Sequence, residues 1–355
     1  MEPLTLHSIH QQRRASFSQV HGRELVKEYD SPRDEYTAAR LAASLFDLSY
    51  RPILRLTGPD RASFLHGMVT NDIKRLADGE TAYAALLTAK GAMISDARIL
   101  RRAEDLLLDV EPGYAQAVQS SLQKYIISED VEVSDVSTEL ALLRVAGPKA
   151  EAILAAAWGS DIALPAGGAR RIEGAGEIWL MRSAPWGERC IDVLVSRGQL
   201  APVYELMLQR GEPLGLKPAG FEALEILRVE EGIARFGQDM DEHTIPLEAN
   251  LEAAINYDKG CYIGQEVIAR ATFRGHVNKK LTGLVLGGEL PGPRASLRRG
   301  EKMVGWISSA VRSPAMGTAI GLGYVQRDCV EPGTHLEVEG YPSGAVTHAL
   351  PFVKS

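Results

Sequence analysis

Cysteine is scarce in this chain of 355 residues, which contains only Cys190, Cys261 and Cys329. So few cysteines exclude a disulfide-stabilised scaffold, and their odd number leaves at least one thiol outside any intrachain pair. The first 30 residues also lack the apolar segment of a signal peptide. Both observations are typical of a protein in a reducing compartment, and we expect it in the cytoplasm.

Long apolar runs and an excess of basic charge are missing as well. No run approaches the roughly 18 residues of a membrane-spanning helix, so no membrane association is expected. Lys and Arg number 39 against 46 Asp and Glu, which gives a net charge of −7 at pH 7. Faces that bind nucleic acid are strongly basic, so direct nucleic-acid binding is not expected. Hydrophobic residues make up 45% of the chain, which excludes a wholly disordered protein.

The common catalytic signatures are also absent. The sequence has no Walker A loop, no GxGxxG after a strand, no GxSxG, no HExxH and no paired CxxC. Its eight histidines are scattered without the spacing of metal ligands, so no metal site is predicted. Any chemistry must therefore come from less common motifs.

A weak internal repeat organises the first half of the chain. The segment ILRLTGPDRASFL (53–65) recurs as LLRVAGPKAEAIL (142–154). In both copies an apolar strand ends at Gly, and the following Pro is predicted at the first position of a helix. The spacing exceeds the roughly 20–50 residues of solenoid repeats, so two similar halves are predicted. Chance similarity is the alternative.

Strands and helices are mixed without strict βαβ alternation, which predicts an α+β fold. From about residue 281, short strands broken by Gly and Pro predict a small antiparallel β-barrel. We therefore expect three units, namely residues 1–139 and 140–279, both α+β, and residues 280–355, the barrel. Residues 1–31 are polar and irregular, and we expect them to form a tail or surface arm.

The segment from Gly220 to Arg270 holds the densest group of candidate functional residues. It begins with an amphipathic helix containing Arg228 and ends shortly after KGCYIGQE, residues 259–266. A cysteine beside a lysine and near a helix start at about Gly264 would have a lowered pKa, because both features stabilise a thiolate. The alternative is a small buried residue in a tight turn. The residues themselves leave both interpretations of Cys261 open.

Several stretches together carry a family resemblance. They are residues 46–72, residues 86–100, LRVEEGIARFGQDMDEHTIPLEANL (227–251) and KGCYIGQE. With them, the chain resembles the YgfZ-type folate-binding proteins, which belong to the superfamily of the glycine-cleavage T-protein (aminomethyltransferase). KGCYIGQE is specific to the YgfZ branch, whereas true T-proteins lack this cysteine. The resemblance spans most of the chain, including the carboxy-terminal barrel.

The resemblance implies three domains in a ring around a central channel for tetrahydrofolate or a one-carbon derivative. It implies that Glu188 grips the pterin, whose amino and ring N–H groups a carboxylate can accept side by side. It also implies folate contacts for Arg228 and for Tyr262 of KGCYIGQE. Asn71 either lines the channel or caps a turn.

One departure from the T-protein pattern concerns catalysis. T-proteins carry two adjacent acids after a strand turn, whereas this chain reads Ser95-Asp96. Aminomethyl transfer needs an acid that polarises or orients the reacting amine. Asp96 is the remaining candidate for that acid, and Cys261 is the candidate functional thiol. The loss of one acid argues against transfer by the T-protein mechanism.

The leading interpretation is a tetrahydrofolate-binding accessory protein that supports iron–sulfur cluster assembly or repair. Its partners would be reduced folate and iron–sulfur client or assembly proteins, and any effect on tRNA modification would be indirect. The alternative is a tetrahydrofolate-dependent aminomethyl- or methyltransferase of the T-protein type, and a third is a scaffold with a vestigial channel. The sequence leaves open whether the chain is an enzyme, and we expect a monomer.

Overall fold

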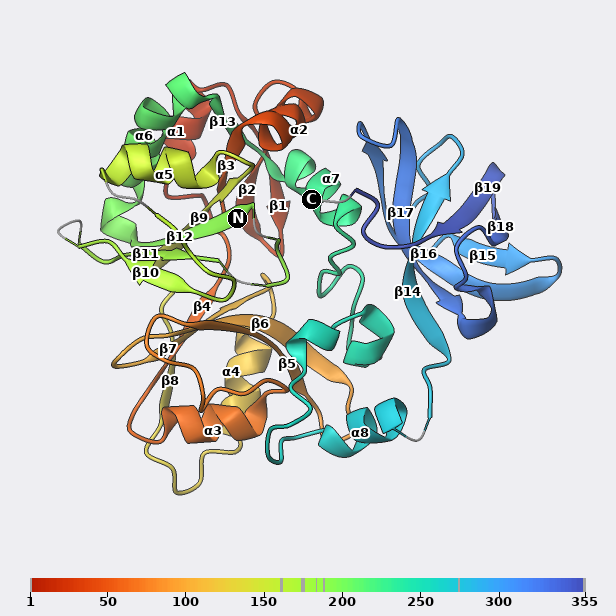
Figure 1. Cartoon of the computed structure of the whole chain (residues 1–355), viewed down its shortest axis with the longest axis horizontal. Helices are drawn as coiled ribbons and strands as arrows, with labels where there is room; N and C mark the ends of the chain where they lie inside the picture. The colour runs from red at the N-terminus through yellow and green to blue at the C-terminus, as the bar shows by residue number, and fades with distance from the viewer. Residues whose placement is uncertain are drawn as a thin grey trace. The chain divides into compact units, whose positions relative to one another are not determined.

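The computed structural model describes residues 2–159, 162–173, 176–182, 184–187, 189–273 and 275–353 (Figure 1). The chain divides into two compact units. The first unit comprises Met1–Leu86, Ser95–Leu224 and Asn256–Tyr262, and the second comprises Leu87–Ile94, Glu225–Ile255 and Ile263–Ser355. The predicted α+β class is confirmed, because both kinds of element occur throughout the first unit.

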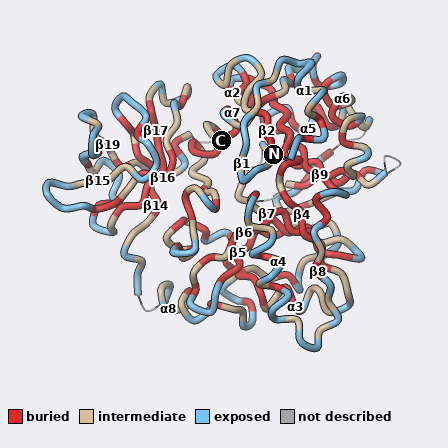
Figure 2. Tube along the Cα trace, turned by 180° about the vertical axis from the view of Figure 1, so that it is seen from behind, coloured by how far each residue is buried: buried red, intermediate tan, exposed pale blue. Residues whose placement is uncertain are grey.

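Two β-sheets form the framework of the first unit. A five-stranded sheet has the order β5 (Thr81–Leu87), β6 (Met93–Arg101), β7 (Leu106–Val110), β4 (Ile53–Thr57) and β8 (Glu132–Asp135). A six-stranded sheet has the order β10 (Ala169–Arg171), β11 (Ile178–Met181), β12 (Cys190–Ser196), β9 (Leu140–Ala146), β3 (Ala43–Asp47) and β13 (Leu216–Ala219). Strands β3, β7, β9 and β11 are buried at every position, and buried residues follow the strands in Figure 2.

In the described part of the first unit, six α-helices that lie wholly within it accompany these sheets. They are α1 (His7–Gln12), α2 (Pro32–Leu41), α3 (Arg61–Met68), α4 (Ala115–Gln123), α5 (Ala150–Trp158) and α6 (Leu200–Gly211). Helices α5 and α6 pack on the six-stranded sheet and share one hydrophobic core with it. Ile153 and Leu154 of α5 and Leu208 of α6 are fully buried in that core. Apolar residues at helical spacing thus supply the contacts that hold this layer together.

The repeat predicted from sequence corresponds to two strand–turn–helix segments, β4–α3 and β9–α5. The prediction that Pro occupies the first helical position is wrong, because α3 begins at Arg61 and α5 at Ala150. Each Gly-Pro pair instead forms a β-turn before the helix, in which the N–H three residues after the glycine donates to the glycine carbonyl. Gly58 and Gly147 have φ angles of +96° and +145°, which favour glycine.

The expectation of an irregular N-terminal tail or arm is wrong. Residues 7–12 form α1, and β1 (Ser16–Val20) pairs with β2 (Arg23–Glu28) as an antiparallel ribbon. Leu6 is fully buried and belongs to the core of the six-stranded sheet. His10 is also fully buried, and its Nε2 lies 2.8 Å from Asp47 Oδ2. The polar composition of this segment hid these anchors, because burial here depends on partners far along the chain.

The second unit contains the predicted β-barrel, which is confirmed. Its strands close in the order β14 (Lys279–Leu286), β17 (Thr318–Gln326), β16 (Lys302–Ser313), β15 (Ser296–Arg299), β18 (His335–Val338) and β19 (Tyr341–His348). Helix α8 (Gln265–Phe273) and most of α7 (Phe221–Glu230) also belong to this unit. Closure removes the exposed edges that an open sheet of short strands would leave.

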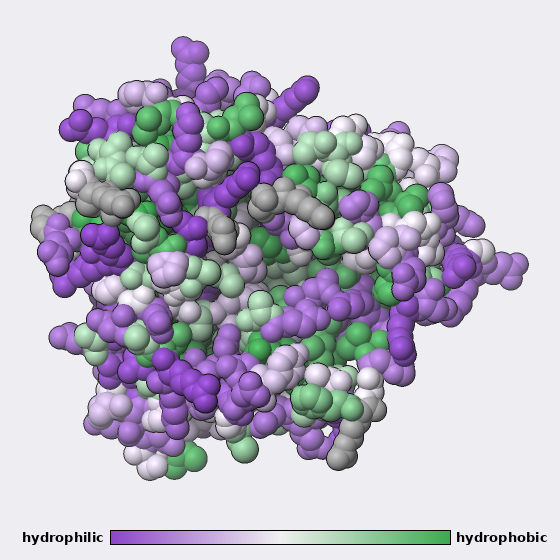
Figure 3. Space-filling model, in the orientation of Figure 1, coloured by the Kyte–Doolittle hydropathy of each residue, from purple (hydrophilic) through white to green (hydrophobic). Residues whose placement is uncertain are grey.

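The division into units 1–139, 140–279 and 280–355 remains a proposal. Strand β3 comes from the first of these segments, yet it pairs antiparallel with β9 and parallel with β13, which lie in the second. Hydrophilic and hydrophobic side chains are interspersed over the visible face of each unit (Figure 3). Within the described residues, no helix has the length and apolar character needed to cross a membrane.

Candidate functional site

Asp96 lies on β6 in the first unit and is only partly buried. Its Oδ2 accepts a hydrogen bond of 2.7 Å from the hydroxyl of Tyr83, a buried residue of β5. Its Oδ1 is buried and has no hydrogen-bond partner among the described residues. One oxygen of this carboxyl group is therefore anchored, and the other is available to a ligand.

Ser95 and Asp96 point to opposite faces of the sheet, because side chains alternate along a strand. Ser95 is fully buried, and its hydroxyl donates to the backbone carbonyl of Asp96. An acid at position 95 would therefore not share a face with the Asp96 carboxyl group. The serine at position 95 leaves the face that carries Asp96 and Tyr83 unchanged.

The surroundings of Asp96 raise its pKa from 3.8 to about 6. Burial is the largest cause, and the negative charge of Glu111 is the next. The hydrogen bond from Tyr83 and the positive charge of Arg51 act in the opposite direction without cancelling the rise. A carboxyl group with such a pKa exchanges its proton near neutral pH, which suits a general acid or base.

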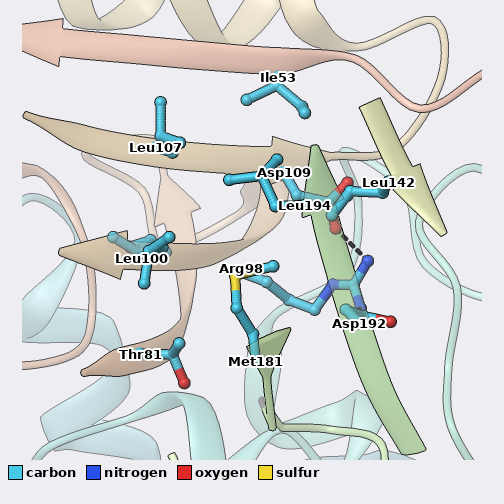
Figure 4. A pocket seen from close by; sticks show the side chains of 11 residues that line it. Ile53, Thr81, Arg98, Leu100, Leu107, Asp109, Leu142, Met181, Asp192 and Leu194 are labelled. Carbon is cyan, nitrogen blue, oxygen red and sulfur yellow. Dashed lines mark hydrogen bonds and ion pairs between the residues drawn. The ribbon is translucent and has the colours of Figure 1, made fainter. Parts of the chain in front are cut away.

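A ladder of buried ion pairs extends from this point toward the six-stranded sheet. Arg51 donates to Asp109 at 2.7 Å and to Glu111 at 2.5 Å. Arg98 bridges Asp109 and Asp192, one from each sheet (Figure 4). Alternating charges therefore tie the two sheets together.

Arg144 of β9 ends the ladder. It donates to Asp192 at 2.6 and 2.9 Å, and its guanidinium lies 4.2 Å from the centre of the Trp186 ring. Arg144 and Arg98 lower the pKa of Asp192 although burial opposes this. Every carboxylate of the ladder therefore has a guanidinium partner.

A small cavity adjoins this ladder and is lined mainly by apolar side chains. Its volume is about 20 Å³, enough for one water molecule. Leu100, Leu107 and Met181 line it together with Arg98 and Asp192 (Figure 4). Its size excludes a folate-sized ligand, so the cavity itself is not the predicted cofactor site.

Asn71 stabilises a turn in the first unit. Its side-chain N–H donates to the backbone carbonyl of Tyr83 at 2.9 Å, and its side-chain oxygen accepts the backbone N–H of Asp72 at 2.8 Å. Of the two roles considered for Asn71, these bonds favour the turn cap. A ligand contact by Asn71 stays a prediction.

Lys259 of the KGCYIGQE motif points into the protein. Its ammonium group donates to three backbone carbonyls, those of His66, of Val69 at 2.6 Å and of Asn71 at 2.9 Å. Two of these carbonyls lie at the end of helix α3, where cations are favoured. The effect on the Cys261 thiol that the sequence suggested for this lysine stays a prediction. Burial lowers the pKa of Lys259 to about 8.

Cys261 is exposed, whereas Cys190 is partly buried and Cys329 is buried in the barrel core. The interpretation of Cys261 as a small buried turn residue is therefore wrong, because its side chain is open to solvent. The ring of Tyr262 lies 4.9 Å from the Lys259 ammonium. Burial raises the pKa of Tyr262 to about 12, so it is a neutral donor or acceptor at physiological pH. The proposed folate contact of Tyr262 stays a prediction.

Arg228 lies in the second unit and is buried. Its five N–H groups donate to the carboxylate of Glu225 twice, to Asp239, to the carbonyl of Ile233 and to the hydroxyl of Ser309. A folate contact by Arg228 would have to replace one of these bonds. Glu188, the residue predicted to hold the pterin, lies outside the described residues.

Several residues around Asp96 were not singled out from the sequence. They are Arg51, Tyr83, Arg98, Asp109, Glu111, Arg144 and Asp192. The available signal was a charged residue inside an otherwise apolar strand, as in LALLRVA (140–146) and CIDVLV (190–195). Buried charges are rare unless they are paired, so such interruptions indicate an ion-pair network.

Two family models match this chain. Residues 6–259 match the GCVT N-terminal domain, and residues 279–354 match the glycine cleavage T-protein C-terminal barrel domain. The aminomethyltransferase of Pelodictyon phaeoclathratiforme is 30% identical over 364 residues, which cover 99% of each chain. The aminomethyltransferase of Shouchella clausii is 31% identical over 343 residues, which cover 94% of this chain and 92% of that protein.

A solved structure supports the same grouping at the level of the fold. The glycine cleavage system aminomethyltransferase T from Bartonella henselae matches with a TM-score of 0.89 at 24% identity, over 99% of this chain and 98% of that chain. This likeness extends over both units, including the barrel. The comparisons support the superfamily predicted from sequence and do not single out its YgfZ branch.

Proposed function

Because the chain belongs to the glycine cleavage T-protein family, we propose that it is a tetrahydrofolate-dependent transferase of aminomethyl or related one-carbon groups. The matched relatives are named aminomethyltransferases, which favours this reading over the accessory role in iron–sulfur cluster assembly. The observation that carries the proposal is Asp96, a carboxyl group with one oxygen anchored by Tyr83 and the other without a described protein partner.

The free acceptor oxygen of Asp96 fits a reduced folate, which carries N–H groups. A buried carboxyl oxygen without a partner is costly unless a ligand supplies one, and an N–H or protonated amine satisfies such an oxygen. When bound, reduced folate would supply the amine nitrogens that accept the one-carbon group. Asp96 would hold the reacting amine in position and exchange a proton with it, while Tyr83 fixes the carboxyl group in one orientation.

The serine at position 95 does not weigh against this proposal. Side chains at 95 and 96 face opposite sides of β6. A single acid on the face of Tyr83 is therefore sufficient for the role described, and its pKa of about 6 allows it both to donate and to accept a proton at neutral pH.

The test combines folate binding with turnover. We expect calorimetry to detect tetrahydrofolate binding, and a lipoyl carrier loaded with an aminomethyl group to be turned over. Asp96→Asn should lower turnover by about 10²–10⁴-fold, which is the usual contribution of a general acid or base. Glu139→Gln is the matched control, because Glu139 is an exposed carboxylate of the same unit that pairs with Arg55.

Each outcome has a separate meaning. Absence of tetrahydrofolate binding by the unaltered chain would remove the folate proposal altogether. Full turnover by Asp96→Asn would remove Asp96 from the reaction. From the family resemblance, we further expect Glu188→Ala to weaken folate binding by roughly 1–3 kcal/mol, as the loss of a charged hydrogen bond would.

A second candidate function rests on the exposed thiol of Cys261. The intact KGCYIGQE motif resembles the YgfZ branch, whose accessory role would use this thiol to support iron–sulfur client or assembly proteins. An exposed cysteine is accessible to such partners, as a buried one is not. Any effect on tRNA modification would then follow from the client enzymes.

This second candidate is separable from the first. Cys261→Ser should leave folate binding and aminomethyl turnover unchanged, while the activity of iron–sulfur enzymes falls in a deletion strain that carries the variant. Cys190→Ser serves as the control, since that side chain is only partly accessible. Full restoration of those enzymes by Cys261→Ser would exclude the thiol role.

A further inference from the structure

Asp96 lies on β6, and Glu111 is the residue that follows the end of the neighbouring strand β7. The antiparallel register of β6 and β7 pairs Ala97 with Val110 and Arg98 with Asp109. Extended by one step past the end of β7, this register places Glu111 next to Asp96, and the negative charge of Glu111 acts on the Asp96 carboxyl group. Side chains two residues apart point to the same face, so Asp96 and Arg98 share a face with Glu111 and Asp109. Like charges directly opposite each other on a sheet are destabilising.

The charged side chains around Asp96 form a group that we call the Asp96 cluster. In the described part of the first unit, it consists of three guanidinium groups and four carboxyl groups: Arg51, Arg98 and Arg144, with Asp96, Asp109, Glu111 and Asp192. If every carboxyl group is ionised, the cluster has one more negative charge than positive charges. Three of the carboxylates form ion pairs with these guanidinium groups. Asp96 is the fourth, and its described partner is the neutral hydroxyl of Tyr83.

Glu111 forms an ion pair with Arg51. Arg51 donates to it at 2.5 Å, and both side chains are mostly buried, with 13% and 16% of their surfaces exposed. Arg51 also donates to Asp109 at 2.7 Å, so its charge is divided between two carboxylates. The negative charge of Glu111 is therefore only partly neutralised where it faces Asp96.

We propose that Glu111 is the second acid of the Asp96 site, a positioning residue whose negative charge makes Asp96 hold its proton to a higher pH. Glu111, which follows β7, lies on the face of Asp96, whereas an acid at position 95 would point to the opposite face. This role in turnover rests on the proposed transfer function. The charge relation itself does not, because it concerns groups of this chain alone.

The groups that surround Asp96 together set how readily its carboxyl group loses its proton. Tyr83 on β5 donates to one oxygen, and Arg51, before β4, supplies an opposing positive charge. Arg98 of β6, Asp109 of β7 and Glu111, just after β7, lie on the same face as Asp96. Asp109 and Asp192 are both bound by Arg98, so Glu111 is the carboxylate of the cluster that Arg98 does not bind. Removing the charge of Glu111 would leave three carboxylates, Asp96 included, to balance the three guanidinium groups.

Carbon-13 NMR of aspartate-labelled protein tests the relation directly, with Asp96→Asn identifying the signal. In the unaltered chain we expect Asp96 to titrate with a pKa of about 6. Glu111→Gln should lower that pKa by about 1, as expected for the loss of a nearby like charge. Glu111→Asp should keep it raised, and the exposed-carboxylate control Glu139→Gln should leave it unchanged.

Two results would overturn the inference. One is an Asp96 pKa near 4 in the unaltered chain, which needs no variant and so remains decisive if Glu111→Gln does not fold. The other is a folded Glu111→Gln in which the Asp96 pKa stays at its original value. In a turnover assay, Glu111→Gln should shift the acidic limb of the pH–rate profile to lower pH, by the same amount as the fall in the Asp96 pKa. Turnover that is absent in the unaltered chain would instead count against the transfer function.

Discussion

Among the described residues, two buried arginine–carboxylate clusters differ in how completely their groups are paired. In the second unit, the Arg228 cluster comprises Arg228, Glu225, Asp239, Ser308 and Ser309, and each N–H group of the arginine has an acceptor. In the first unit, the Asp96 cluster leaves one carboxyl oxygen without a described partner. Saturated pairing indicates a structural role, whereas the unsatisfied oxygen indicates a place for a ligand.

The two carboxyl groups at the centres of these clusters titrate in opposite directions. The pKa of Asp239 is lowered by Arg228 and by the hydroxyls of Ser308 and Ser309, although burial opposes this. The pKa of Asp96 is raised to about 6, because burial and Glu111 outweigh its one hydrogen bond from Tyr83. Burial is common to both groups, so the sign of the shift depends on the partners that each side chain meets.

The largest effect is expected from Arg228→Met. This change leaves the buried carboxylate of Asp239 without its cation, which costs about 3–5 kcal/mol when a buried pair is broken. Urea unfolding should show the loss as a lower midpoint. Arg270→Met is the control, because Arg270 forms an exposed pair with Glu266 and such pairs contribute about 0–1 kcal/mol. Equal losses in both variants would contradict the structural role of the Arg228 cluster.

A smaller effect of opposite sign is expected from Asp96→Asn. The folded-state pKa of about 6 lies above the ordinary 3.8, so this group stabilises the fold below about pH 4 and loses that contribution as pH rises through 6. At pH 7 its ionised form is a net cost, and the amide should raise the free energy of unfolding by about 1–2 kcal/mol.

The pH dependence provides the measurement for Asp96→Asn. The difference in unfolding free energy between the unaltered chain and the variant should grow from pH 4 to pH 6 and then level off. A stabilised variant with impaired turnover would fit a site that trades stability for function. A variant that is destabilised at pH 7 would show that Asp96 is paired in the folded protein, as Asp239 is.

The smallest effect on stability is expected from Cys261→Ser, because the side chain is exposed. The change in unfolding free energy should stay within about 0.5 kcal/mol. In the folded chain, iodoacetamide should modify Cys261 before Cys190, and Cys329 should react only after unfolding, since it is fully buried in the barrel. Early labelling of Cys329 would contradict the described barrel core.

Local elements of the fold were predictable because their signals lie within a few residues. The apolar strands predicted in the repeated segments 53–65 and 142–154 are present in the structure as β4 and β9. The glycine- and proline-broken strands after residue 281 indicated the barrel. The N-terminal helix was not predicted, since His10 is buried only by virtue of Asp47 and other distant partners.

The superfamily, the α+β class, the barrel and Asp96 as the candidate acid could all be predicted from the sequence, because they follow from local patterns and motifs. The surroundings of that acid depend on how the chain folds. The pairing of β6 with β7 brings the charge of Glu111, just after β7, to bear on Asp96, and the approach of two sheets brings Arg98 to Asp192. The same folding turns the Lys259 ammonium toward the carbonyls at the end of α3. Electrostatic effects of this kind depend on distances between residues far apart in sequence, so spacing along the chain does not reveal them.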